Sequence, residues 1–143
     1  MITLGTPQPD IVSALSIDPD ISDAVRAYLG PLDGRDIQTF WIYEAGLPVG
    51  QIALHDGDRA QGEALVAYHI FRATDRGRGV GRQALALLEE FARSETSLRT
   101  LVVITGRNNR ASRRIAEACD FVEAGGAWED PERLVVYVWM IPH

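Results

Sequence analysis

The chain has 143 residues, of which 46% are hydrophobic and 24% charged, and its 14 basic and 20 acidic residues give a net charge of −6. This length and composition predict one ordinary globular domain over residues 1–143, and they exclude a wholly disordered chain, a collagen-like repeat and a coiled coil. The single cysteine, Cys119, excludes an intrachain disulfide and a cysteine-rich zinc site.

Turn residues and hydrophobic periodicity define the elements of the first half of the chain. Residues 1–19 contain three prolines, so we expect them to be irregular. Asp20 and its neighbours predict a capped helix over 20–28, and Gly30 and Pro31 are expected to end it. Segments rich in aromatic and β-branched residues then predict strands at 40–44, 49–54 and 64–71.

The hydrophobic period changes in the second half. Apolar residues at helical spacing predict helices over 81–93 and 109–118, and the apolar run 101–105 between them is typical of a strand buried on both faces. Two more strands are expected at 121–124 and 134–140. The predicted order is therefore α-β-β-β-α-β-α-β-β, which places the chain in the α/β class.

Nothing in the sequence predicts a membrane segment. The longest strongly apolar run, 134–141, is far too short to cross a bilayer, and the first ten residues lack the basic residues of a secretory signal. We therefore expect a cytoplasmic protein with no membrane partner.

Charge is distributed unevenly along the chain. All 14 basic residues are arginines, and the segment 72–114 holds ten of them with only four acidic residues, a net charge of +6, which leaves −12 for the remainder. A basic segment of this kind predicts an anionic ligand. The acidic remainder disfavours nucleic-acid binding and favours a cationic or amine substrate, although an ordinary solvated surface would also explain it.

A glycine-rich loop between a predicted strand and a predicted helix is the strongest chemical signal. Its residues are Arg76, Gly77, Arg78, Gly79, Val80, Gly81 and Arg82. Glycines let the backbone approach a ligand closely, and the amides at a helix N-terminus favour phosphate. A P-loop is excluded because the chain has no lysine, and the glycine spacing does not fit a Rossmann fingerprint. The structural alternative is a turn that only joins strand to helix.

Two motifs together resemble a known enzyme family. Arg76-x-x-Gly79-x-Gly81 is similar to the Gln/Arg-x-x-Gly-x-Gly/Ala signature of the GCN5-related N-acetyltransferase (GNAT) superfamily, and Asn109-x-x-Ser112 is similar to that family's Asn-x-x-Ser/Ala helix. The predicted strand 101–105 lies between them, as the family order requires. The resemblance covers residues 38–141.

The resemblance implies a mixed, strongly bent central sheet flanked by helices, with acetyl-CoA in a cleft where two parallel strands splay apart. It implies that backbone groups of Ile70 and Phe71 bind the pantetheine arm and that amides from Arg76 to Arg82 hold the pyrophosphate. It also places Asn109 and Ser112 near the distal arm and the thiol. A structural role for Asn109, as the cap of its own helix, stays open beside this.

The reaction implied is direct attack of an amine on the acetyl thioester. Tyr68, expected to face the acceptor, the strand-end carboxylate of Glu44 and the hydroxyl of Ser112 are the candidate catalytic groups. Neighbouring His69 has a suitable pKa for a base, but it is expected to be a packed strand histidine.

The sequence departs from the family at two positions. Ala116 stands where many relatives have a tyrosine that protonates the thiolate, and Asp120 stands where they have glycine. A non-catalytic acyl-CoA-binding protein of the same fold is therefore the alternative function. A homodimer also stays open, because many small relatives pair through sheet edges.

Overall fold

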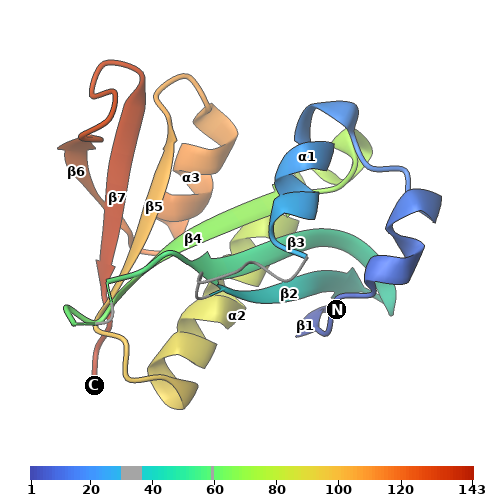
Figure 1. The fold of residues 1–143 in the computed structure, drawn as a ribbon, viewed down its shortest axis with the longest axis horizontal. Coiled ribbons are helices and arrows are strands. Elements are labelled where there is room, and N and C mark those ends of the chain that lie inside the picture. The colour runs from blue at the N-terminus through green and yellow to red at the C-terminus, as the bar shows by residue number, and fades with distance from the viewer. Residues whose placement is uncertain (30–36, 59) are drawn as a thin grey trace.

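The computed structural model describes residues 1–29, 37–58 and 60–143, and these form one seven-stranded sheet with helices on both faces (Figure 1). The strands, in their order across the sheet, are β1 (Ile2–Gly5), β2 (Ile37–Glu44), β3 (Leu47–His55), β4 (Glu63–Ile70), β5 (Thr100–Gly106), β7 (Leu134–Met140) and β6 (Val122–Gly126). The helices are the 3₁₀ helices η1 (Pro9–Ala14) and η2 (Ala73–Asp75) and the α-helices α1 (Pro19–Ala27), α2 (Val80–Glu95) and α3 (Arg110–Ala118).

The parallel pair β4 and β5 stands at the centre of an otherwise antiparallel sheet. Their register runs only from Glu63 opposite Thr100 to Leu65 opposite Val102. Beyond these three pairs the two strands diverge, and Figure 1 shows β4 and β5 pointing in clearly different directions. The sheet is therefore mixed and bent, as expected, and it opens between its two central strands.

Each face of the sheet carries its own apolar cluster. The larger cluster packs α2 and α3 against the strands, with Leu85 and Leu88 of α2 fully buried. The smaller cluster packs η1 and α1 against the other face, around the fully buried Trp41. The Trp41 indole N–H donates to Gln51 Oε1 (3.0 Å), and Gln51 Nε2 donates to the Val25 carbonyl oxygen of α1 (2.9 Å). Buried hydrogen bonds thus fix α1 on the sheet.

The expectation that residues 1–19 are irregular is wrong. Ile2 is buried and its strand pairs with β2, while Val12 of η1 packs into the smaller cluster. Both elements are stabilised by partners far away in the sequence, which local pattern does not reveal. Helix α1 begins at Pro19 and is capped by Asp18 rather than by Asp20, whose amide donates to the Asp18 side chain (3.0 Å).

The other predicted elements are confirmed in type and order, with small shifts of their ends. The predicted helix end at Gly30 and Pro31 lies outside the described residues. Among the helices of the described segments, none is long and apolar enough to cross a membrane.

Candidate functional site

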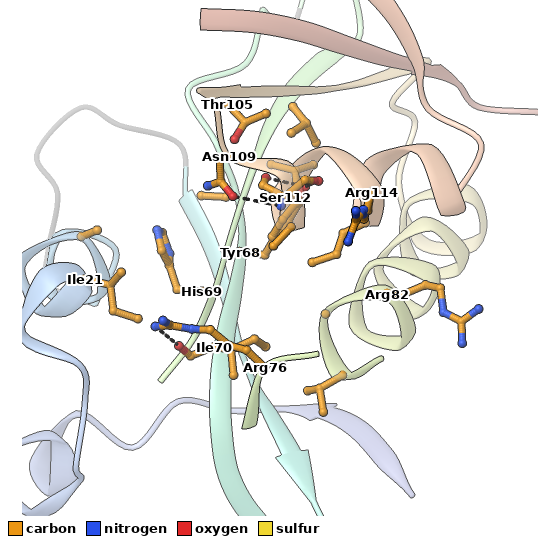
Figure 2. A pocket seen from close by; sticks show the side chains of 18 of the residues that line it. Ile21, Tyr68, His69, Ile70, Arg76, Arg82, Thr105, Asn109, Ser112 and Arg114 are labelled. Atoms are coloured by element: carbon orange, nitrogen blue, oxygen red, sulfur yellow. Dashed lines mark hydrogen bonds between the residues drawn. The ribbon is translucent and has the colours of Figure 1, made fainter. Parts of the chain in front are cut away.

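A cavity of about 910 Å³ opens where β4 and β5 part. Residues 65–70 of β4 and 103–105 of β5 line its walls, and α1, the glycine-rich loop and α3 complete it. Its lining comes from both sides of the sheet, because the missing β4–β5 pairs leave a passage between the two faces. Figure 2 shows side chains from α1, β4 and α3 meeting in this space.

The glycine-rich loop presents a run of unpaired backbone amides to the cavity. Within the described part of the chain, the N–H groups of residues 77–82 have no hydrogen-bond acceptor, whereas the Arg76 amide donates to the Ala73 carbonyl oxygen (3.1 Å). Gly77 (φ 76°) and the α2 N-cap Gly79 (φ 82°) take left-handed conformations that glycine adopts without strain. Unpaired amides of this kind, at a loop and the first turn of a helix, are donors that could hold an anion.

Gly81 is needed for a different reason. A Cβ built there would lie 2.7 Å from Ile115 Cδ1 of α3, so the glycine allows α2 and α3 to approach closely. This packing holds the amides of the loop beside α3.

Arg78 and Glu44 lie outside the cavity and bind each other. The Arg78 guanidinium donates to both Glu44 carboxylate oxygens (3.1 and 2.9 Å) and to Asp75 (3.0 Å). Hydrogen bonding to Arg78 holds the pKa of the Glu44 carboxyl below its usual value. The predicted catalytic carboxylate is thus placed in an ion pair that braces the glycine-rich loop against β2.

The end of β4 is only partly open. Ile70 lines the cavity, and its carbonyl oxygen accepts from Arg76 Nη2 (3.2 Å), which also pairs with Asp18 (3.1 Å). Phe71 is buried, its amide donates to Val49 and its carbonyl oxygen accepts from the Asp18 amide (2.7 Å). Of the two residues predicted to hold the pantetheine arm, the structure gives only Ile70 a place on the cavity wall.

Tyr68 points toward α3 rather than toward the α1 side. Its hydroxyl donates to the Ser112 carbonyl oxygen (2.9 Å) and accepts from the Ser112 hydroxyl (3.0 Å). Burial raises the pKa of Tyr68 to about 12, against the opposing effect of the Ser112 hydrogen bond. Asn109 caps α3 by accepting from the Ser112 amide (3.1 Å), and all three residues line the cavity. Ala116, one turn further along α3, is buried in the core.

His69 lies on the opposite side of β4 from Tyr68. Figure 2 shows its ring turned toward Ile21 of α1, while Tyr68 lies beside Ser112. Its Nδ1 is buried and has no hydrogen-bond partner in the described segments. Burial, with a smaller contribution from Arg76, lowers the pKa of the His69 imidazole.

The two ends of the cavity differ in charge. Asp18 and Asp20 line the α1 end, whereas Arg82 and Arg114 line the end between α2 and α3. Sequence reasoning did not single out Asp18, Asp20 or Arg114 as site residues. Arg114 lies two positions after Ser112, so the motif around Ser112 could have suggested it. Asp18 and Asp20 could not have been found in this way, because nothing in the sequence places α1 beside β4. Across the described residues, no group of three or more His, Cys, Asp or Glu could hold a metal ion.

Comparisons with known protein families and structures agree with this fold. The model of the acetyltransferase (GNAT) domain matches residues 9–122, and no curated protein sequence matches the chain. A probable acetyltransferase of known structure is 22% identical, with a TM-score of 0.76 over 97% of this chain and 92% of its own. The spermidine N-acetyltransferase from Vibrio cholerae, solved with CoA and spermine, is 15% identical, with a TM-score of 0.79 over 98% of this chain and 95% of its own.

A third structure, RimJ from Mycobacterium smegmatis with CoA-disulfide, is 19% identical, with a TM-score of 0.74 over 97% of this chain and 81% of its own. At these identities the likeness shows the fold, and it confirms the mixed, bent sheet expected from the two motifs.

Proposed function

The chain belongs to the GNAT acetyltransferase family, and we propose that it transfers an acetyl group from acetyl-CoA to a primary amine by direct attack in a ternary complex. The observation that carries this proposal is the run of free amides over residues 77–82, which opens on the cavity between the parted strands. Backbone amides and a helix N-terminus together favour a diphosphate.

The cavity fits the parts of acetyl-CoA in order. The amides of 77–82 would hold the diphosphate, and Arg82 and Arg114 would add charge-assisted hydrogen bonds to phosphate at the same end. The pantetheine arm would run along β4 past Ile70, with Arg76 giving up the Ile70 carbonyl oxygen. Asn109 and Ser112 would then lie near the distal arm and the sulfur.

The transfer needs the two reactants held in line. The amine nitrogen forms a bond to the thioester carbonyl carbon, the C–S bond breaks, and the sulfur leaves with the electron pair. Positioning of this kind supplies most of the rate gain that a transferase of this type needs. Acetyl-CoA supplies the acetyl group, and the protein supplies the alignment and two proton transfers.

Tyr68 and Ser112 are placed to serve the leaving sulfur. With its pKa raised to about 12, the Tyr68 phenol stays protonated over the physiological range, so it keeps an O–H to offer. The Ser112 hydroxyl, 3.0 Å away, can pass a proton through the same pair. We assign this pair the role that the family's tyrosine would have at position 116, where this chain has alanine.

Two measurements on the intact protein test the proposal. Titration calorimetry should show binding of CoA and acetyl-CoA, and release of free thiol from acetyl-CoA should depend on an added amine from a panel of polyamines, aromatic amines and peptides. Binding without turnover for every amine would favour the non-catalytic alternative. Absence of CoA binding would refute the proposal itself.

A further inference from the structure

We propose, building on the function proposed above, that His69 is the base that takes the proton from the acceptor amine, and that the amine therefore enters from the α1 side of the cavity. Neither the family match nor the two motifs assign a role to this residue. The inference comes from where β4 places His69 and from the state of its ring nitrogens.

Strand geometry separates Tyr68 and His69, two neighbouring ionisable side chains of β4. Successive side chains of a strand point to opposite faces, so Tyr68 and His69 stand on opposite sides of the opening. The register agrees, because His69 is paired with Gln51 of β3, whose side chain bonds to α1. A thioester in the opening would therefore have the Tyr68–Ser112 pair on its α3 side and His69 on its α1 side.

Within the described residues, no hydrogen bond holds the His69 ring. Nδ1 is buried, and neither ring nitrogen bonds to any described residue. Its register neighbour Gln51 is already engaged with Trp41 and with the Val25 carbonyl oxygen, so it does not orient the ring. Buried polar atoms in native proteins almost always have partners, so an exception beside a cavity points to a catalytic role or to a bound water.

The charges around His69 keep it able to accept a proton. Arg76 of the glycine-rich loop disfavours the imidazolium, and burial does so more strongly. The other charged or titratable groups on this part of the cavity wall are Asp18, the N-cap of α1, Asp20 of α1, Tyr28 at the C-terminal end of α1, His55 at the end of β3, and Asp75. Because the pKa of His69 is lowered, the ring is neutral at pH 7, which is the form a base requires.

The proton balance is complete without another reactant. The nitrogen forms its bond to the carbonyl carbon and loses one N–H proton to Nε2 of His69. The sulfur leaves with the C–S electron pair and gains a proton from the Tyr68–Ser112 pair. His69 returns its proton to solvent through the cavity, which restores the neutral ring, and the Tyr68–Ser112 pair regains a proton from solvent, so each turnover ends with no net change in bound protons.

The test compares wild type with His69→Gln, which keeps similar volume and polarity but cannot accept a proton. The control is His143→Gln, because His143 is exposed and, among the described residues, its side chain hydrogen-bonds to the Leu98 carbonyl oxygen, away from the cavity lining. Each protein is assayed by thiol release with the amine from the panel that wild type uses best, and its CoA affinity is measured by calorimetry. His69→Asn provides a second replacement in case glutamine disturbs the strand.

We expect His69→Gln to lower kcat by roughly 10²–10⁴-fold while its CoA affinity and that of His143→Gln stay within twofold of wild type. The ratio of wild-type to variant rates should shrink as the pH falls below about 6.5, since protonation of His69 disables the wild type alone. The acceptor's own ionisation cancels in this ratio.

Three results would overturn the inference. One is a His69→Gln or His69→Asn variant that retains more than a third of wild-type kcat. Another is a rate ratio that does not change with pH, which would make His69 a structural residue. Wild type that binds CoA but acetylates no amine would remove the proposed function, and this inference with it, while active variants would remove the inference alone.

Discussion

Replacing Gly79 with alanine distinguishes the proposed anion-binding role of the glycine-rich loop from the contribution of Gly79 to the stability of the fold. Gly79 has φ 82° and ψ 9°, and a Cβ added there would lie 3.6 Å from Arg82 Nη2 and 3.7 Å from Gln83 Nε2, which are ordinary contacts. The left-handed conformation of the alanine should therefore be the main destabilising effect, lowering the free energy of unfolding by about 1–2 kcal/mol. For a chain of this size, that lowers the melting temperature by roughly 2–8 °C.

Binding of CoA should suffer more than stability does. The new methyl group stands on the surface where a phosphate must approach the free amides of 77–82 to within hydrogen-bond distance. Loss of one charge-assisted hydrogen bond costs about 1.5–3 kcal/mol, which corresponds to roughly 10- to 150-fold in affinity. Titration calorimetry with CoA measures this directly, and thermal unfolding measures the stability term.

Gly46→Ala is the matched control. Gly46 also has φ 82°, a Cβ there would meet nothing within 4 Å, and the residue lies in the β2–β3 turn away from the cavity. Both variants should melt lower by similar amounts, and only Gly79→Ala should lose CoA affinity. Equal CoA affinity for the two variants would show that the diphosphate does not lie on this loop.

Two further substitutions test the pKa shifts. Tyr68→Phe removes the hydroxyl from the Ser112 pair and should lower kcat about 10- to 100-fold in the thiol-release assay with unchanged CoA affinity; a parallel loss of both would indicate a structural role. Burial, and secondarily Asp120, raise the pKa of Glu89 to about 7, above its value of 4.5 in the unfolded chain. The folded protein thus binds more protons between these values, and stability falls as the pH rises from about 4.5 to 7. Glu89→Gln should melt higher than wild type at pH 8 and equally at pH 4, and a difference that does not vary with pH would contradict this.

The sequence could predict the glycine-rich loop because its requirements are local. Two of the three glycines have positive φ, a conformation that glycine adopts without strain, so this requirement is written in the residue type itself. The same holds for Asn109, whose cap on the Ser112 amide spans three residues. Signals of this range are visible in a single sequence.

Other parts of the site depend on contacts between distant segments. Alternation along a strand is enough to put Tyr68 and His69 on opposite sides, but only the packed helices decide what each side faces. The pairing of Arg78 with Glu44 joins residues 34 positions apart through the β2–β3 hairpin. Neither fact follows from periodicity, because each is set by the tertiary placement of α1, α3 and β2.

The charge of the arginine-rich segment 72–114 can be interpreted only after the arginines that form ion pairs are set aside. Arg78, Arg93 and Arg113 are neutralised by acidic neighbours, whereas Arg82 and Arg114 face the cavity without an ion pair in the described parts of the chain. The local charge is therefore positive at the end between α2 and α3, whereas at the α1 end Asp18 is paired with Arg76 and Asp20 contributes negative charge.

Under the proposed function, an anionic donor and a cationic amine would be drawn to opposite ends of one passage. Because the passage exists only where the β4–β5 pairing stops after three residue pairs, the short register between these strands would allow two oppositely charged reactants to meet from the two faces of the sheet. Extension of that pairing would close the site without changing a single side chain that lines it.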